Sequence, residues 1–169
     1  MNNIDLRPLT YADIDEVVMA FHRIGWDKPT SLFQHYLDEQ QNGARTVLIA
    51  RDNNRFCGYV TLKWTSDYSS FANQHVPEIV DLNVLPDFRK RGIGTMLIKA
   101  CEKMAKGRGA IEIGLGVGLL ADYGSAQRLY VSLGFMPDGQ GLHYKNIAVK
   151  YNENVKADDD LVIYLTRRL

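Results

Sequence analysis

The sequence is poor in cysteine and carries no excess of charge. Its two cysteines, Cys57 and Cys101, each lie in an apolar run without a second cysteine nearby. Such spacing is typical neither of a disulfide framework nor of a zinc site, so we expect two buried free thiols and no bound metal. The 20 Lys and Arg residues balance 20 Asp and Glu residues, which leaves a formal net charge of +0. No overall charge therefore favours binding to nucleic acid or to an anionic membrane.

Long apolar runs are also missing. No segment approaches the ~18 continuous apolar residues of a membrane-spanning helix, and the stretch Met1–Pro8 lacks the apolar core of a signal peptide. We therefore expect a soluble, cytoplasmic protein that has no membrane partner. The 169 residues, 46% of them apolar, suffice for one compact domain over residues 1–169 with its own core.

Apolar periodicity predicts a mixed α/β fold. Thr10 and Asp13 form a capping pair ahead of one apolar helical face made by Ile14, Val17, Val18 and Phe21. Further helices are predicted near residues 32–41, from Gly92 to Gly107, and around residues 126–133. A polar loop is predicted over Thr65–Pro77. Extended, β-rich runs predict strands at Ile4–Arg7, Thr46–Ala50, Phe56–Leu62, Ile79–Leu85, Ile111–Leu115, Leu142–Tyr144 and Leu161–Leu165. This order favours a mixed sheet flanked by helices over a fold in which strands and helices strictly alternate along the chain.

One segment has the features of an anion-binding turn. After the strand that ends near Leu85, the chain reads Arg89-Lys90-Arg91-Gly92-Ile93-Gly94-Thr95 and then enters a helix. A helix N-terminus presents backbone N–H groups without intrahelical partners, together with the positive end of the helix dipole. Glycines allow an anion to approach the backbone closely. Three basic residues there add positive charge, so a diphosphate is the ligand that this pattern suits.

This segment resembles the pyrophosphate motif of the GNAT superfamily of N-acetyltransferases, which are acyl-CoA N-acyltransferases. That motif is Arg/Gln-x-x-Gly-x-Gly/Ala directly after the fourth strand, and Arg89, Gly92 and Gly94 match it. The resemblance implies a GNAT-like fold and acetyl-CoA as co-substrate. It further implies that Leu82, Asn83 and Val84 pair with the pantetheine arm, and that the pyrophosphate is held by Arg89, Lys90, Arg91, Gly92, Ile93, Gly94 and Thr95.

A second family block is matched in part. It is similar to Asn-x-x-Ala-x-x-x-Tyr followed by Gly-Phe, and here Ala126, Tyr130 and Gly134-Phe135 are in register. By this resemblance Ala126 and Tyr130 belong to the cofactor-binding residues. Tyr123 replaces the asparagine of the family pattern, which removes a side-chain amide contact to the cofactor.

The resemblance also implies the reaction and candidates for its acid and base. An acetyl group would pass from acetyl-CoA to a primary amine by direct attack in a ternary complex. Tyr130 occupies the position of the family's usual acid for the departing thiolate, although an aromatic residue there also packs well in a core. Glu78 lies eleven residues before Arg89, as does the catalytic glutamate of some members. Asp81, a charge in an apolar strand, and a water chain are the alternative bases.

The acceptor is the least defined part of the interpretation. Trp26 and Tyr36 fall where the family shapes its acceptor pocket, and His75 precedes Glu78 in the chain, but packing or a place on the surface is the more ordinary role for all three. A small molecule or a peptide amine would fit. Family habit suggests a homodimer, to which the apolar strand Leu161–Leu165 could contribute.

Two other functions compete with this interpretation. Gly116-Val117-Gly118 begins a formal match to the dinucleotide-binding pattern, but too few residues follow it for a second nucleotide-binding half. A module of the same fold that binds acyl-CoA without turning it over is the stronger alternative. Transfer to amines with release of free thiol would distinguish an enzyme from such a module.

Overall fold

The structure is a computed structural model that describes residues 4–169. Contacts divide the chain into two compact units. The first unit contains the described residues up to Trp64 together with Val80–Cys101, and the second contains Thr65–Ile79 and Glu102–Leu169. Strand β4 (Glu78–Val84) contributes to both units, as does helix α4 (Ile93–Gly107).

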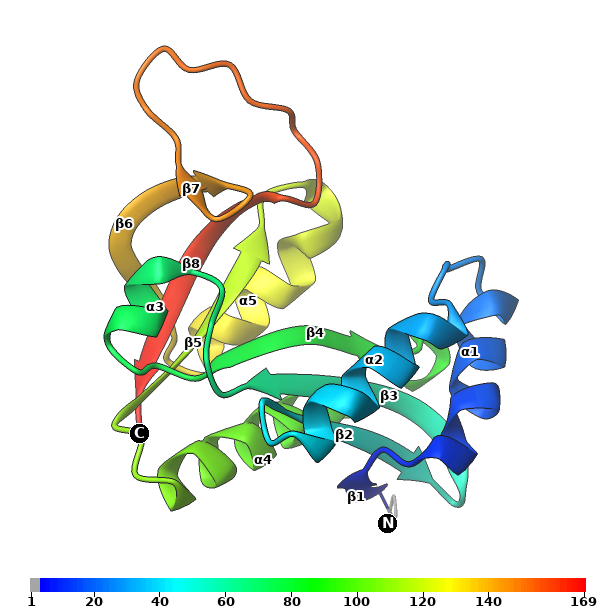
Figure 1. The fold of residues 1–169 in the computed structure, drawn as a ribbon. Helices are drawn as coiled ribbons and strands as arrows, with labels where there is room; N and C mark the ends of the chain where they lie inside the picture. The colour runs from blue at the N-terminus through cyan, green and yellow to red at the C-terminus, as the bar shows by residue number, and fades with distance from the viewer. Residues whose placement is uncertain (1–3) are drawn as a thin grey trace. The chain divides into compact units, whose positions relative to one another are not determined.

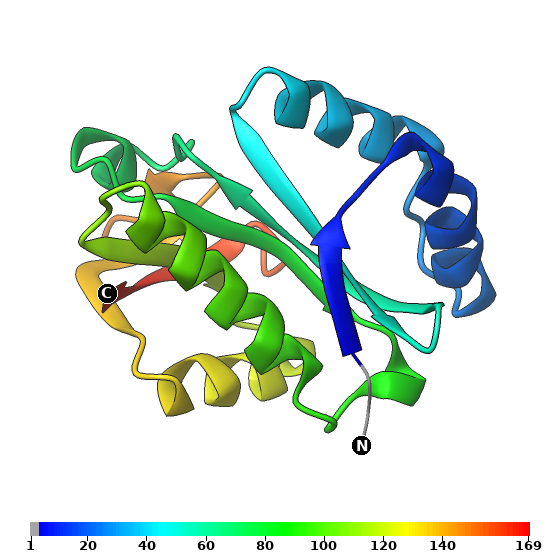
Figure 2. The same cartoon turned by 90° about the horizontal axis from the view of Figure 1, so that it is seen from below.

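The first unit contains an antiparallel sheet that ends on β4. β1 (Ile4–Pro8) pairs with β2 (Arg45–Asp52), which forms a hairpin with β3 (Arg55–Lys63). β4 follows β3 in the sheet. The hairpin turn is made by Asn53 and Asn54, which both adopt positive φ angles, as is typical of a tight two-residue hairpin turn. Figure 2 shows β1 next to the hairpin strands.

Helices cover both faces of this sheet. The chain forms a short 3-10 turn, η1 (Tyr11–Asp13), before α1 (Ile14–Arg23), and α2 (Thr30–Gln41) follows. α1 and α2 lie over one face of β2 and β3, whereas α4 begins on the opposite face (Figures 1 and 2). The predicted apolar face of α1 is the buried one, because Ile14, Val17 and Phe21 are in the core.

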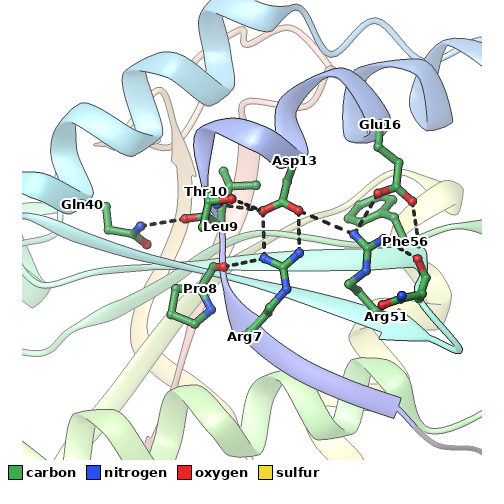
Figure 3. A network of polar contacts seen from close by, with 10 residues as sticks. Arg7, Pro8, Leu9, Thr10, Asp13, Glu16, Gln40, Arg51 and Phe56 are labelled. Carbon is green, nitrogen blue, oxygen red and sulfur yellow. Dashed lines mark hydrogen bonds and ion pairs between the residues drawn. The ribbon is translucent and has the colours of Figure 1, made fainter.

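A network of ion pairs ties the start of α1 to the sheet (Figure 3). The carboxylate of Asp13 accepts hydrogen bonds from Arg7 Nη1 at 2.8 Å and from the Thr10 hydroxyl at 2.7 Å. The Thr10 amide donates to the same carboxylate, which confirms the predicted capping pair. Arg51 of β2 pairs with Glu16 of α1 at 2.8 Å. The Arg7 hydrogen bond, which outweighs the effect of burial, holds the pKa of Asp13 far below its usual value.

The second unit contains the other part of the sheet. Its strands are β5 (Glu112–Gly118), β6 (Met136–Tyr144), β7 (Ile147–Ala148) and β8 (Leu161–Arg168). β5 pairs in parallel with the start of β4, and β8 lies antiparallel between β5 and β6. Through β4 the hydrogen-bonded order of the strands is β1-β2-β3-β4-β5-β8-β6-β7, which confirms the predicted mixed sheet. Because β8 has a neighbour on each side, it has no free edge for pairing with a second copy.

The connections of the second unit contain structure that the sequence pattern did not predict. The segment expected to be a polar loop forms a short helix, α3 (Ser69–Asn73), and buries Tyr68, Phe71 and Val76. After β5, a 3-10 turn, η3 (Ala121–Tyr123), leads into α5 (Gly124–Ser132). β6 is longer than the three residues predicted for it. An aromatic cluster explains the unexpected burial, because Tyr68 stacks on Tyr164 with ring centroids 3.7 Å apart.

Both cysteines are buried, free thiols, as expected. Within residues 4–169, no helix combines the length and the apolar character needed to cross a bilayer.

Alternate glycines of β5 make room for aromatic rings. A Cβ atom built on Gly114 would overlap the buried ring of Phe71, and one built on Gly118 would lie 2.5 Å from the ring of Tyr123. At Gly116 the nearest atom, on Tyr164, is 3.1 Å away. These glycines are therefore spacers for ring packing, which accounts for the pattern that formally resembles a dinucleotide-binding loop.

This packing predicts a difference between two matched substitutions. Gly114→Ala should lower the free energy of unfolding by about 1–3 kcal/mol, because the Phe71 ring is enclosed and must shift. Gly116→Ala should cost clearly less, because its neighbour needs to move only slightly. Urea unfolding of both variants measures the difference. Equal stability of the two variants would contradict the close packing at Gly114.

Candidate functional site

The predicted anion-binding turn has the local structure that such a site needs. After β4, a 3-10 turn, η2 (Pro86–Phe88), leads to Arg89 in an extended conformation. Lys90 and Gly92 then adopt left-handed backbone conformations, with φ angles of 58° and 80°. α4 begins at Ile93. Two left-handed residues in a short segment reverse the chain sharply and leave the first-turn amides of α4 at the end of the turn.

Gly92 is required by its backbone conformation. Its φ of 80° is unfavourable for residues with a side chain, yet a Cβ atom built there meets no atom of the described chain within 4 Å. The space beside Gly92 is therefore open on the side where a side chain would project. Gly94, in the first turn of the helix, is half-buried.

Two of the three basic residues of the turn have partners within the protein. Arg91 pairs with Asp52 at the end of β2 at 2.6 Å. The Arg89 Nε donates to the Val84 carbonyl at 3.0 Å, and its guanidinium lies over the Trp26 ring. Lys90 is exposed. Charge repulsion within the basic run is thus smaller than the sequence alone suggests, and an anion bound here would depend mainly on backbone amides and on Lys90.

β4 is irregular directly before the predicted pantetheine-binding residues. Asp81 adopts a left-handed conformation, with φ of 54°, within an otherwise extended strand. This conformation is uncommon for a residue with a side chain and is typical of functional sites. A Cβ atom on Gly58 of β3 would lie 2.5 Å from the Asn83 carbonyl, so β3 approaches β4 closely at this point.

The carboxylate of Asp81 is surrounded by four hydrogen-bond donors. Its Oδ1 atom accepts from Lys28 Nζ at 2.6 Å and from the Asn83 side-chain amide at 2.7 Å. Its Oδ2 atom accepts from the Tyr36 hydroxyl at 2.9 Å and from the Tyr59 hydroxyl. Each oxygen therefore receives two donors, the full set that a buried carboxylate needs. We call this group of five residues the Asp81 cage.

Electrostatics keep the Asp81 cage in one protonation state near neutral pH. Burial alone would raise the pKa of Asp81, but the charge and hydrogen bond of Lys28 and the Tyr59 and Tyr36 hydroxyls lower it below its usual value. Burial, followed by the nearby Asp81 charge, raises the pKa values of Tyr36 and Tyr59 well above normal. An ionised carboxylate thus faces two protonated hydroxyls and one ammonium group.

A buried arginine supports one side of the cage. Arg45 pairs with Glu39 of α2 at 2.6 Å and donates to the Thr61 hydroxyl at 2.6 Å. Its guanidinium lies 4.4 Å from the centroid of the Tyr36 ring. The Thr61 hydroxyl in turn donates to the Val80 carbonyl at 3.0 Å. These contacts fix Tyr36 and the backbone next to Asp81.

Glu78 begins β4 in the second unit and is buried. Its Oε2 atom accepts a hydrogen bond from the Ser66 hydroxyl at 2.6 Å, and the Ser66 hydroxyl oxygen accepts the Tyr68 amide at 2.9 Å. Burial, and then the charge of Glu78, raise the pKa of Tyr164. The glutamate is therefore a positioned side chain within the aromatic cluster, and not a solvated residue at a loop exit.

Tyr130 lies on α5 in the second unit and is buried beside Phe135, with ring centroids 6.1 Å apart. Burial, with a smaller effect of Tyr123, raises the pKa of Tyr130 to about 12. The phenol therefore keeps its proton at neutral pH. Ala126 is half-buried one turn earlier, and the ring of Tyr123, at the position of the family's asparagine, lies against Gly118.

The remaining candidates are dispersed. Trp26 stacks on Phe21 with centroids 5.9 Å apart, and His75 is exposed in a left-handed conformation. Within residues 4–169, no three potential metal ligands gather.

A hollow of about 290 Å³ lies beside the predicted turn rather than in it. Its walls come from α1, the start of β3 and the segment Leu85–Phe88, and they carry charges of both signs.

The structure thus groups the predicted residues by unit. The turn, the segment Leu82–Val84 and Asp81 belong to the first unit, whereas Glu78, Ala126 and Tyr130 belong to the second. Sequence analysis missed Lys28 and Tyr59 as partners of Asp81. A charge in an apolar strand was the available signal that Asp81 needs partners, but no local pattern identifies residues so distant in the chain.

A sequence model of the acetyltransferase (GNAT) family matches residues 11–135. No curated protein matches the chain. Several solved structures share the fold at low sequence identity.

The PaiA N-acetyltransferase of Thermoplasma acidophilum, in complex with coenzyme A, is 16% identical over 99% of both chains, with a TM-score of 0.68. An acetyltransferase of the GNAT family from Elizabethkingia anophelis, with acetyl-CoA bound, is 22% identical over 100% of both chains, with a TM-score of 0.64. A ribosomal-protein-alanine N-acetyltransferase from Brucella melitensis is 17% identical over 98% of this chain and 99% of that chain, with a TM-score of 0.72. At these identities the similarity shows the fold.

The electrostatics of the cage lead to a pH-dependent prediction. In Lys28→Met, the pKa of Asp81 should rise, because burial remains while the opposing charge is lost. Carbon-detected NMR titration of the carboxyl group measures the shift, and Lys99→Met, at an exposed position on α4, is the matched control.

The rise in the pKa of Asp81 in Lys28→Met should also change how the free energy of unfolding depends on pH. The folded-state pKa of wild-type Asp81 lies below the unfolded value of about 3.9, so ionisation of Asp81 stabilises the fold above that pH. This stabilisation is lost as the pH falls through the folded-state pKa. The stability advantage of the wild type over Lys28→Met should therefore be largest near neutral pH and shrink on acidification. An unchanged pKa in Lys28→Met would show that the hydroxyl and amide donors alone hold the carboxylate.

Proposed function

The chain belongs to the GNAT family of acetyltransferases, and we propose that it moves an acetyl group from acetyl-CoA to a primary amine by direct attack in a ternary complex. Membership of the family supports acyl transfer from an acyl-CoA in general. The observation that carries the finer proposal is the turn at Arg89–Thr95, whose geometry suits a diphosphate.

In this proposal the diphosphate of the coenzyme lies on the turn. The first-turn amides of α4 donate to its oxygens, and the helix dipole adds favourable potential. The open side of Gly92 leaves space for the ligand. Lys90, which is exposed, adds a mobile positive charge. Arg91 instead holds the turn against Asp52, which favours a positioning role over direct contact.

The pantetheine arm would then extend along β4. Leu82, Asn83 and Val84 end β4, ahead of η2 and the turn, and are half-buried. Peptide-like amides of pantetheine can pair with backbone groups as an added strand does. The Asn83 side chain is already engaged with Asp81, so we assign cofactor contact to the backbone of this residue.

The attacking amine must lose a proton, and Glu78 is the better base. Asp81 is saturated by four donors and its pKa is lowered, so it is a weak proton acceptor. Glu78 is buried, with the Ser66 hydroxyl holding one carboxylate oxygen in place. Proton removal by this carboxylate, directly or through a water molecule, is general base catalysis.

Tyr130 would stabilise the departing thiolate. A thiol has an ordinary pKa of about 8.5, and the Tyr130 hydroxyl, with a pKa of about 12, is the weaker acid. Full proton transfer from Tyr130 to the thiolate is therefore unfavourable without simultaneous reprotonation from solvent. A hydrogen bond from the phenol to the developing negative charge needs no such transfer and lowers the barrier.

A module that binds acyl-CoA without transfer remains the second candidate. The direct test is to incubate the protein with acetyl-CoA and single amines, among them polyamines, aminoglycosides, amino acids and peptides with a free N-terminus, and to detect free thiol. Amine-dependent release supports transfer. Binding of acetyl-CoA without release for any amine would support the module.

A substitution in the turn tests the cofactor site. Gly94→Glu should weaken acetyl-CoA binding at least tenfold, about 1.4 kcal/mol, because it places bulk and negative charge in the first turn of α4. Calorimetric titration measures the affinity. Lys99→Glu makes a larger change of charge on the same helix outside its first turn and should have a much smaller effect. Unchanged affinity in a folded Gly94→Glu protein would remove the turn from the site.

A pH–rate profile tests the two catalytic assignments together. Tyr130→Phe keeps the buried ring and should lower kcat about 10- to 100-fold, a barrier increase of about 1.4–2.7 kcal/mol, with little loss of stability. Glu78→Gln should lower kcat/KM most near neutral pH. Rising pH should partly restore the rate, because the amine then deprotonates without help.

Acetyl-CoA affinity is the control for both variants and should change little. Full activity of Tyr130→Phe would reduce this residue to packing against Phe135. A Glu78→Gln profile parallel to that of the wild type would assign proton removal to bound water instead.

A further inference from the structure

The Asp81 cage is arranged to bind a primary ammonium group, and Lys28 supplies one. We infer that Lys28 occupies, in the protein without substrate, the position that receives the protonated amine of the acceptor. The inference rests on the proposed transfer to an amine and deepens it, because it places the ammonium group of the acceptor beside Asp81 and Tyr59.

The cage contains the groups that recognise an ammonium ion. Lys28 Nζ lies 2.6 Å from Asp81 Oδ1 and 5.7 Å from the centroid of the Tyr59 ring. A carboxylate on one side and the face of an aromatic ring on the other attract the cation by two independent interactions. Three of the four acceptor positions of the Asp81 carboxylate are taken by the Tyr36 hydroxyl, the Tyr59 hydroxyl and the Asn83 amide. The fourth acceptor position is therefore the one that faces the ammonium group.

Among the four donors, Lys28 is the one that can leave most easily. Tyr36 lies on α2, Tyr59 on β3 and Asn83 on β4, so packing holds all three in place. Lys28 belongs to the connection between α1 and α2 and has a long, flexible side chain. The side chains of Lys28 and Asp81 are 20% and 17% exposed, so the ion pair is reached from solvent.

The cage would keep its shape after Lys28 leaves. Arg45 fixes the Tyr36 ring, and Thr61 fixes the backbone at Val80. The left-handed conformation of Asp81 holds its side chain among the hydroxyls. An incoming ammonium would therefore meet a preorganised carboxylate, which lowers the cost of binding. It would also lie beside Leu82, the first residue of the segment assigned to the pantetheine arm.

This exchange makes Lys28 a built-in competitor. A primary alkylammonium offers the same three N–H donors and the same slender alkyl stem as the lysine side chain. A quaternary ammonium carries the charge but cannot donate, and a neutral alcohol lacks the charge. Binding selectivity for the primary ammonium over both analogues is thus a direct consequence of the cage.

The probe is n-butylammonium, titrated at pH 7 into the 15N-labelled full chain. The side-chain amide signals of Asn83, which donates to Asp81, report binding in the cage. We expect Lys28→Met to bind n-butylammonium at least fivefold more tightly than the wild type, because the competing ammonium is gone. Tetramethylammonium and n-butanol should bind at least tenfold more weakly than n-butylammonium in the same variant.

Three variants serve as controls. Lys28→Arg retains a cation at the position and should not show the gain in affinity. Lys99→Met removes an exposed lysine elsewhere on the first unit and should match the wild type. Lys28→Met combined with Asp81→Asn should lose the gain, because the carboxylate is needed; the thermal unfolding profile of each variant confirms that it is folded.

Unchanged or weaker binding by folded Lys28→Met would overturn the inference, as would equal binding of n-butylammonium and tetramethylammonium. Thiol release separates this result from the proposed function. If Lys28→Met binds n-butylammonium more tightly but no amine releases thiol from acetyl-CoA, the result supports the cage and rejects amine transfer. If n-butylamine does release thiol but its KM is no lower in Lys28→Met than in the wild type, the result supports the transfer and rejects Lys28 as the competitor.

Discussion

The negative charge of Asp81 on β4 needs a cation and hydrogen-bond donors beside it, because its carboxylate is largely shielded from water. Much of the first unit is arranged to supply these partners. A buried carboxylate without hydrogen bonds would be strongly destabilising. Its donors come from the α1–α2 connection, from α2, from β3 and from β4 itself. Helices on one face of the sheet are thereby joined to the strand that we propose carries the pantetheine arm. The left-handed conformation of Asp81 stays populated because so many contacts determine it.

The same strand leads into the predicted anion-binding turn, so the two features share one support. Gly58 lets β3 approach the backbone of Asn83, and the Leu85 amide donates to the Cys57 carbonyl at 2.9 Å. Beyond η2, Arg91 pairs with Asp52, which lies beside the turn of the same hairpin. Leu85 before the basic turn and Arg91 within it are thus both tied to the hairpin before any ligand binds. Rigid placement of backbone amides costs little entropy on binding, which suits recognition of a diphosphate.

Sequence reasoning succeeded where the signal is local and failed where it is not. The pairing of Thr10 with Asp13 and the glycines of the basic turn both act within a few residues, and the structure confirms the helix starts that they predicted. The helix at Ser69–Asn73 was missed because its burial depends on stacking against Tyr164, nearly a hundred residues later. Lys28 and Tyr59 were missed as partners of Asp81 for the same reason. The roles of Glu78 and Tyr130 stay predictions, since the structure gives their surroundings and not their chemistry.

Two carboxylates in one strand receive different tasks from their surroundings. Asp81 is held ionised by a cation and three neutral donors, which favours binding a positive charge and disfavours taking up a proton. Glu78 has a hydroxyl donor and aromatic neighbours, and its negative charge raises the pKa of Tyr164. An enzyme that acts on amines needs both properties, because the amine arrives as a cation and must react as a neutral nucleophile. Separate residues can perform the two steps only if their environments differ, and the two carboxylates meet this condition, because a cation and three neutral donors surround Asp81 whereas a serine hydroxyl holds Glu78.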